Sequence, residues 1–510
     1  MVIFMNKFIV LFFIFSLSLF AQNDKTDWLK VHNLTLEGID HLYNMNFDEA
    51  SKKFSELQRI VPNDPRGYFF NAIQYYFLFS IERKKEYYNR FFDLSEKVIK
   101  ICENLIEQNE NDYNSKFYLA GIYGYRGIMY QLDNSIVKAV WDGKKGFSLL
   151  KQIVKEKPDL YDAYLGTGLF DYLLAKIPKT FSWILSALGY SGSIENGLKQ
   201  LKIAEEKGVY TKQEARFYLS QFLLFEKRYD EAFYYIKKLI KEYPENSLFL
   251  ISYANMESRI DKPEFAIEPC KKAIEINKKK NITSGDDLAY IVLANAHFLL
   301  NDFYSASEYY EIYLKKVPKD NLEYLLNYNF FQMGLSNDFS GKRDKAIESY
   351  KMTKKVNMEK RPWDALFYIR AQYFINNVPN ENYKKIVIAN NYLKRKKTEE
   401  ALKEYLNIIS LSNLREDEKI VCYFNIGEIY LNNNNLEQSQ KYFDLATKTK
   451  PTIEKYLIPY AYYKLGKIAL LKKDYFNTKE YFNKAKEFEN YPYEESIRDS
   501  IKIELKKIPG

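Results

Sequence analysis

Apolar and small residues recur along the chain at positions that suit pairs of antiparallel helices. In one stretch the aromatic Tyr423 and the small Gly427 are followed by the small Ser439, the aromatic Phe443 and the closing Pro451. Small residues let two helices approach closely, and large residues fill the gaps beside them. Because proline cannot continue a helix, it ends the second one. The pattern therefore predicts a helical hairpin.

The same arrangement of small and large residues returns along most of the chain. It begins with Gly38, Ala50 and Phe54 near the N-terminus. The small residue that starts the second helix of the later pairs recurs at intervals of 34, 40, 40, 55, 38 and 39 residues. These residues are Ala232, Ala266, Ala306, Ala346, Ala401, Ser439 and Thr478. The longest interval predicts an extra helix from Trp363 to Ile375, and the repetition indicates stacked hairpins.

These offsets resemble those of the tetratricopeptide repeat. The resemblance implies an all-α fold, a right-handed superhelical solenoid of antiparallel helix pairs whose first helices line a concave surface. It also implies a non-catalytic protein that binds proteins or peptides. We expect an N-terminal helical region over 22–210, a central array over 211–360 and a C-terminal array over 361–510 with a capping helix near 493–507.

Residues 65–160 depart from the regular repeat. Three glycines, Gly121, Gly124 and Gly127, fall within one apolar stretch there and indicate a close approach to a neighbouring helix. The apolar positions predict irregular, longer helices at roughly 66–82, 84–108, 112–130 and 134–156.

Residues 1–21 have the layout of a secretory signal peptide. Lys7 gives the positive start, Phe8–Phe20 is apolar apart from two serines, and Ala21 is a small residue at the cleavage point. The apolar run is short for a membrane span, which needs about 20 residues. We expect cleavage before Gln22 and export to the periplasm or cell envelope. An uncleaved N-terminal anchor is the alternative.

Residues 166–204 carry a second, more specific pattern. It resembles the signature of the inclusion-body-clearance family of tetratricopeptide proteins. The resemblance implies α-helical repeats without a catalytic site, and a role in protein aggregates and lipid-related traffic in eukaryotic cells. Because the chain carries an export signal, we carry over the fold and not the role. The matching motifs are Gly168-Leu169-Phe170-Asp171-Tyr172, Ile177-Pro178, Trp183-Ile184-Leu185 and Gly189-Tyr190-Ser191-Gly192.

An apolar stretch inside this segment, near 180–188, predicts a short inserted helix. One interpretation is internal packing that plugs the solenoid. The other is a wedge that touches a membrane or a partner, built on Phe181, Trp183 and Ile184. The second interpretation makes peripheral membrane contact an alternative to protein binding.

The distribution of charge and the lack of catalytic motifs exclude several classes of function. Basic residues number 76 and acidic residues 67, but the signs are interleaved, as on a solvated helical surface. We therefore expect no nucleic-acid partner. The three histidines and three isolated cysteines form no metal or nucleophile motif, and no phosphate-binding glycine loop is present. These features predict a protein that is not an enzyme and needs no cofactor or metal.

Side-chain amides occupy one position of the predicted concave surface. Each follows the small residue of a first helix: Gln221, Asn255, Asn295 and Asn390. Amides donate and accept hydrogen bonds, so they suit the backbone of an extended peptide. Alternatively, they link neighbouring repeats. The apolar candidates for the same groove are Leu288, Ile291, Phe298, Tyr383, Ile386, Phe424, Tyr460 and Tyr463.

The sequence as a whole predicts a non-catalytic scaffold in the bacterial cell envelope that binds a protein or peptide. Solenoid curvature provides such a surface without requiring a reaction. The alternative is a membrane-associated envelope assembly or transport accessory factor that uses the apolar helix around Trp183.

Overall fold

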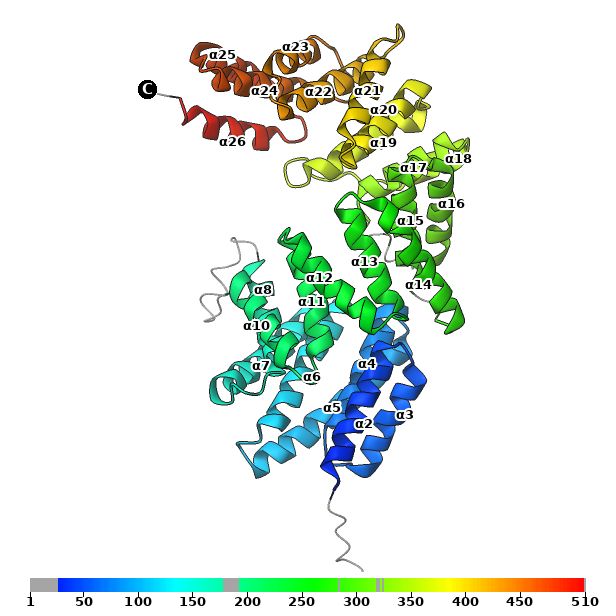
Figure 1. The fold of residues 1–510 in the computed structure, drawn as a ribbon, viewed down its shortest axis with the longest axis vertical. Helices are drawn as coiled ribbons and strands as arrows, with labels where there is room; N and C mark the ends of the chain where they lie inside the picture. The colour runs from blue at the N-terminus through cyan, green and yellow to red at the C-terminus, as the bar shows by residue number, and fades with distance from the viewer. Residues whose placement is uncertain (1–25, 178–191, 283–284, 318–321, 323–324, 509–510) are drawn as a thin grey trace, which may run out of the picture. The chain divides into compact units, whose positions relative to one another are not determined.

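The computed structural model describes residues 26–177, 192–282, 285–317, 322 and 325–508. Within these ranges the regular structure is helical, with no strand. The chain divides into two compact units, Met1–Asn246 and Ser247–Gly510, so the division falls inside the array predicted over 211–360. In each unit, the helices pack in antiparallel pairs (Figure 1). The predicted all-α, tetratricopeptide-like fold class is confirmed.

The first unit contains the long, irregular helices. The predicted helices between 65 and 160 correspond to α4 to α7, and each observed end lies within two residues of the expected one. The described helices of this unit are α2 (Trp28–Tyr43), α3 (Phe47–Ile60), α4 (Arg66–Glu82), α5 (Lys85–Gln108), α6 (Tyr113–Leu132), α7 (Ile136–Glu156), α8 (Ala163–Ala175), α10 (Ile194–Lys207), α11 (Lys212–Phe225) and α12 (Tyr229–Glu242).

The second unit contains the more regular hairpins. The extra helix expected near 363–375 is α19, and the helix expected near 493–507 is α26. The described elements of this unit are α13 (Ser247–Arg259), η1 (Pro263–Phe265), α14 (Ile267–Lys279), α15 (Asp286–Leu299), α16 (Phe303–Lys316), α17 (Asn327–Phe339), α18 (Arg343–Lys351), α19 (Pro362–Asn376), α20 (Glu381–Lys394), α21 (Thr398–Ile409), α22 (Glu416–Asn432), α23 (Leu436–Thr447), α24 (Leu457–Leu471), α25 (Tyr475–Lys486) and α26 (Glu494–Leu505).

Four of the hairpins close through a glycine on one helix and an aromatic ring on the next. A Cβ atom added at Gly427 in α22 would lie only 2.9 Å from the ring of Phe443 in α23. That ring is fully buried, so the missing side chain is what allows the two helices to touch. The same relation joins three further pairs: Gly38 with Phe54, Gly334 with Tyr350, and Gly466 with Phe482.

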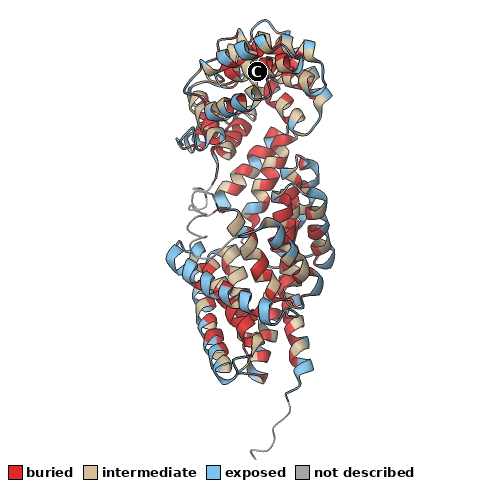
Figure 2. Cartoon of the chain, turned by 90° about the vertical axis from the view of Figure 1, so that its left-hand side faces the viewer, coloured by how far each residue is buried: buried red, intermediate tan, exposed pale blue. Residues whose placement is uncertain are grey.

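The buried residues lie where the paired helices face each other. Figure 2 shows buried residues on the faces where helices meet and exposed residues on the outer faces. Several helices also begin with a side-chain cap, which satisfies a backbone N–H that has no partner within the helix. At α6, for example, the Asp112 carboxylate accepts a hydrogen bond from the Ser115 N–H at 3.0 Å. Local signals of this kind explain why the element boundaries follow the sequence closely.

Candidate functional site

The predicted groove residues fall in both compact units. Gln221 lies on α11 in the first unit, where its amide donates a hydrogen bond to the Ser220 hydroxyl at 3.0 Å. The other predicted groove residues all lie in the second unit. The structure therefore does not bring the four amides together within one compact unit.

The asparagine amides of the second unit differ in their surroundings. Asn255 on α13 is exposed. The Asn295 carbonyl oxygen accepts a 2.7 Å hydrogen bond from the Tyr310 hydroxyl, inside the same hairpin. The Asn390 carbonyl oxygen accepts from the Tyr405 hydroxyl at 2.6 Å and from the Asn425 amide at 3.2 Å. Since Asn425 lies on the first helix of the next pair, Asn390 links neighbouring repeats.

The apolar candidates separate by exposure. On α15, Leu288 is 53% exposed and Ile291 is half-buried. Phe298, Ile386 and Phe424 are buried in the packing between helices. An incoming ligand can therefore reach Leu288 directly and Ile291 in part, whereas Phe298, Ile386 and Phe424 are closed off inside the helix packing.

The C-terminal candidates pack against α26. Tyr460 and Tyr463 on α24 lie beside the cluster that includes the buried Ile497 and Ile501 of α26. Burial raises the pKa of both tyrosine hydroxyls. The sequence places these two tyrosines on the predicted concave side but cannot show that the terminal helix folds back over α24.

A buried ion pair between distant parts of the sequence lies near Tyr383. The Arg370 guanidinium of α19 donates two hydrogen bonds, at 2.7 and 2.8 Å, to the buried carboxylate of Glu454. Burial raises the pKa of the Tyr383 hydroxyl, and Arg370 lowers it in part. The partners are separated by 84 residues in sequence, so no local pattern reveals the pair.

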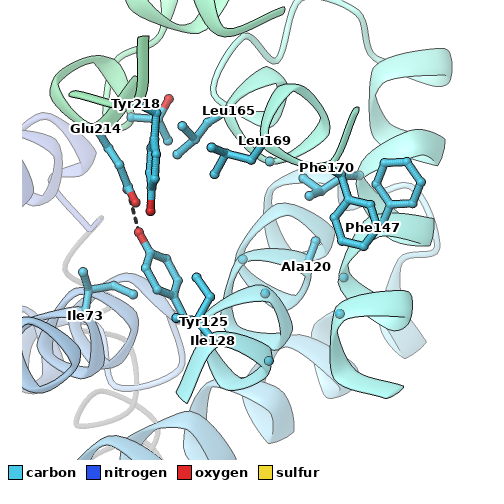
Figure 3. Close-up of a pocket in the computed structure, with 18 of the residues that line it drawn as sticks. Ile73, Ala120, Tyr125, Ile128, Phe147, Leu165, Leu169, Phe170, Glu214 and Tyr218 are labelled. Atoms are coloured by element: carbon cyan, nitrogen blue, oxygen red, sulfur yellow. Dashed lines mark hydrogen bonds between the residues drawn. The ribbon is translucent and has the colours of Figure 1, made fainter. Parts of the chain in front are cut away.

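The first unit encloses a cavity of about 600 Å³ between α2, α4, α6, α7, α8 and α11. Its wall is almost entirely apolar, with Ile73 from α4, Phe147 from α7, and Leu165 and Leu169 from α8 (Figure 3). Sites for small molecules in proteins typically measure roughly 300–1,000 Å³. The lining comes from six helices spread along the sequence, so no single stretch of sequence reveals the cavity.

Glycines shape one side of this cavity, where α6 and α7 cross. A Cβ atom at Gly146 would lie 2.7 Å from the Ala120 carbonyl oxygen, so this glycine is required for the close crossing. A Cβ atom at Gly124 or Gly143 would meet no other atom within 4 Å. Both residues line the cavity, so the space beside them is open. The predicted close approach is observed at Gly121, where a Cβ atom would lie 3.0 Å from the Phe69 ring, and at Gly127, where it would lie 3.1 Å from the Ala139 carbonyl oxygen, but not at Gly124.

One carboxyl group lies deep in the cavity wall. The Tyr125 hydroxyl of α6 donates a 2.6 Å hydrogen bond to the Glu214 carboxylate of α11 (Figure 3). Burial raises the pKa of Glu214 to about 7, and the bond from Tyr125 opposes this shift in part. Spacings of four and seven residues place Tyr218 and Gln221 on the same face of α11 as Glu214. That shared face is the sequence signal that could have identified Glu214.

Exposed apolar side chains stand at the rim of the cavity. Ile136, Val140 and Leu173 line the cavity and are 57%, 64% and 55% exposed. Val137 and Trp141 lie beside them on α7 and are also exposed. A contiguous apolar surface of this kind usually marks a contact with a ligand, a partner or a membrane.

Some predicted features lie outside the described residues. These are the signal segment 1–21 and the wedge residues Phe181, Trp183 and Ile184. Within the described part of the chain, no helix combines the length and apolarity needed to cross a membrane. There, too, no group of three or more histidine, cysteine or acidic side chains is placed to hold a metal ion.

Two family models match the sequence. The model described as Iml2/Tetratricopeptide repeat protein 39 matches residues 162–319, a range that includes the segment expected to resemble the inclusion-body-clearance family. The model described as Tetratricopeptide repeat matches residues 420–453. No curated protein matches the chain.

Solved structures with similar helical repeats include a monomeric mutant of IFIT1 with Gppp-AAAA. It shares 14% identity with a TM-score of 0.29, over 92% of this chain and 97% of that one. The TPR domain of P58(IPK) shares 15% identity with a TM-score of 0.20, over 74% of this chain and 94% of that one. At these scores the matches carry no information on what this chain binds.

The family models and the packed hairpins agree on the class of protein. Tetratricopeptide-repeat proteins are generally non-catalytic scaffolds that bind proteins or peptides. This chain is a tetratricopeptide-repeat protein that contains, over residues 162–319, a segment of the Iml2/Tetratricopeptide repeat protein 39 type.

Proposed function

We propose that the chain is an exported scaffold that holds a protein or peptide partner on the surface formed by α13 and α15. The observation that carries this proposal is the set of accessible groups on these two contacting helices: the amide of Asn255, the aliphatic group of Leu288 and the exposed part of Ile291. An amide and an apolar anchor on adjoining helices suit a peptide, because the amide can bond the peptide backbone while apolar side chains are buried.

The two faces of α15 explain why this surface is available. Ala289, Leu293 and Ala296 face the core and are buried. Leu288 is exposed on the other side of the helix, whereas Ile291 is half-buried and packs partly against the core. The core-facing residues hold the helix in place, and Leu288 can then be changed with little effect on folding.

Site-specific photo-crosslinking would test the proposed surface. A photoreactive amino acid replaces Leu288 in one variant and, as a control, the 79%-exposed Phe476 of α25 in another. We expect a discrete crosslinked partner from envelope extract at position 288 and none at 476. The variant Leu288→Asp should lose the same partner in a pull-down. Equal crosslinking at both positions, or capture unaffected by Leu288→Asp, contradicts the proposed surface.

Export belongs to the same proposal. It rests on the charge, apolar run and small residue of the segment 1–21. Mass spectrometry of the chain purified from bacterial envelope should find a mature N-terminus at Gln22. A full-length chain that still begins at Met1 and sediments with membranes would instead favour the uncleaved anchor.

A second candidate function is a membrane-associated assembly or transport accessory factor. The exposed side chains of Val137, Val140 and Trp141 on α7 favour it, because contiguous apolar side chains can enter a lipid interface. Flotation with liposomes should then weaken in Trp141→Asp and in Trp183→Asp. Flotation of both variants at the level of the wild-type chain would exclude this candidate.

A further inference from the structure

The cavity of the first unit is larger than packing alone explains. Protein interiors are close-packed, and voids larger than a water molecule are few. Here about 600 Å³ lies between six helices, and three of its lining residues are more than half exposed at the rim. The cavity is therefore an open site and not a sealed packing defect. We propose that it binds one long alkyl or acyl chain, with the head group of the ligand at the exposed rim.

The polarity of the wall distinguishes a hydrocarbon chain from a peptide. A bound peptide would bring a buried N–H and C=O at nearly every residue, and each needs a partner. Two carboxyl groups line the cavity. Asp162 already accepts hydrogen bonds from the backbone N–H groups of Val209, Tyr210 and Thr211, each at 2.9 Å. A hydrocarbon chain needs no such partners, so it fits this wall.

The second carboxyl group, that of Glu214, does not oppose an apolar ligand. It accepts the Tyr125 hydroxyl hydrogen bond, so these two polar groups partly satisfy each other. Burial also shifts its pKa to about 7, so much of the group is uncharged near neutral pH. The polar residues Gln131 and Lys144 line the cavity and are exposed, so they suit the polar head of a ligand at the rim.

Two glycines with open space beside them, Gly124 and Gly143, are further evidence for a ligand site. Glycine in a helix interior is unfavourable relative to alanine, so it needs a structural reason. At Gly146 that reason is the crossing of α6 and α7. At Gly124 and Gly143 no neighbouring atom would contact a Cβ atom, and what a side chain would occupy there is the cavity. Those two glycines preserve room for the ligand.

A titration with single-chain amphiphiles would test this proposal. Lauric acid and dodecanol, both below the concentrations at which they aggregate, are mixed with the full chain, and uptake is followed by native mass spectrometry and calorimetry. We expect the wild-type chain to take up one molecule. The substitutions Gly124→Leu and Gly143→Leu should each weaken binding by about tenfold or more, since they fill the cavity. Ser148→Leu, which places a leucine side chain on the exposed face of α7, should leave binding unchanged.

Circular dichroism and urea unfolding establish that each variant is folded before it is compared. Failure of the wild-type chain to take up either probe overturns the proposal. So does undiminished uptake by the folded Gly124→Leu and Gly143→Leu variants.

A second experiment identifies where the bound alkyl or acyl group comes from. Vesicles of phosphatidylethanolamine and phosphatidylglycerol are incubated with the protein and removed by centrifugation, and lipid in the supernatant is then measured. Phospholipid bound to the wild-type chain, and reduced in Gly124→Leu, supports the proposal with a membrane lipid as ligand. Uptake of the monomeric probes without phospholipid supports it with a soluble single-chain amphiphile as ligand. This test is independent of the surface on α13 and α15, which lies in the other unit.

Discussion

At the scale of single residues, glycine has two opposite roles in this chain. At Gly466 the space beside the Cα atom is occupied by the ring of Phe482, whereas at Gly124 it is open. Both glycines lie inside helices, so the intrinsic preference of the helix for alanine is the same at the two positions. Only the surroundings differ, and they determine the sign of the effect of adding one methyl group.

Alanine substitutions at the two positions should therefore have opposite effects. We expect Gly124→Ala to stabilise the first unit by about 0.5–1 kcal/mol, the typical cost of a helical glycine. We expect Gly466→Ala to destabilise the second unit by about 1–3 kcal/mol, because the buried Phe482 ring cannot move aside. Urea unfolding midpoints of the two variants measure both effects. A gain in stability at Gly466 would show that the Phe482 ring can move away from the position 2.4 Å from an added Cβ atom.

Glu214 predicts a dependence of stability on pH. The tyrosines near it from the surrounding helices are Tyr43 of α2, Tyr76 of α4, Tyr125 of α6 and Tyr218 of α11, and burial raises the pKa of all four hydroxyls. They remain neutral at ordinary pH. Within this group of neighbours, only Glu214 titrates near neutral pH, with its pKa raised from 4.5 to about 7.

The sign of the effect follows from the proton balance. Between pH 4.5 and 7 the folded state holds the Glu214 proton and the unfolded state does not, so stability falls as pH rises through this window. The full shift corresponds to at most about 3 kcal/mol. We therefore expect Glu214→Gln to be more stabilising at pH 8 than at pH 5, measured by urea unfolding at each pH. Equal effects of the substitution at both pH values would show that Glu214 is already ionised at pH 5.

At the scale of elements, local patterns predict the helices well and their longer contacts poorly. The ends of α4 to α7 follow the apolar spacing and the caps, which depend on neighbours a few residues away. The hairpin register follows from a glycine and a ring sixteen residues apart, as at Gly427 and Phe443. In contrast, the cover that α26 gives to Tyr460 depends on the path of the chain after the last hairpin.

The terminal helix allows a matched test of its packing. Ile501 of α26 is buried and Ile503, two residues later on the same helix, is 59% exposed. We expect Ile501→Ala to destabilise the second unit by about 2–5 kcal/mol, because it leaves a cavity against α24. Ile503→Ala should change stability by no more than about 0.5 kcal/mol. Both are measured by urea unfolding. Similar losses from the two substitutions would indicate fraying of the helix and not its packing.

At the scale of the whole molecule, contacts beyond adjacent repeats could not be predicted from the sequence. A solenoid is held chiefly by contacts between neighbouring repeats, and those follow from the repeat pattern. The second unit adds longer links. The Asn391 amide of α20 donates to the Phe298 carbonyl oxygen of α15 at 2.7 Å, across 93 residues. The apolar cavity of the first unit likewise needs six helices at once, so no single stretch of sequence reveals it.

Among these longer links, the Arg370 and Glu454 pair combines opposite charges with two hydrogen bonds. A double-mutant cycle measures the interaction free energy between the two side chains. Loss of Arg370 alone leaves the buried Glu454 carboxylate without its two hydrogen bonds. We expect Arg370→Met to destabilise the second unit by about 3–5 kcal/mol. The double variant with Glu454→Leu should recover much of that loss, because no buried charge then remains unpaired.

The same variants also test whether the second unit unfolds in one cooperative transition. If α19 and the segment before α24 are coupled through this pair, the single variant should separate the urea transition of the unit into two steps, because the hairpins on the two sides of the pair no longer stabilise each other. The double variant should restore one transition. A single transition in every variant, with losses that simply add, would mean that adjacent hairpins alone carry the cooperativity and that the ion pair serves only to satisfy its own charges.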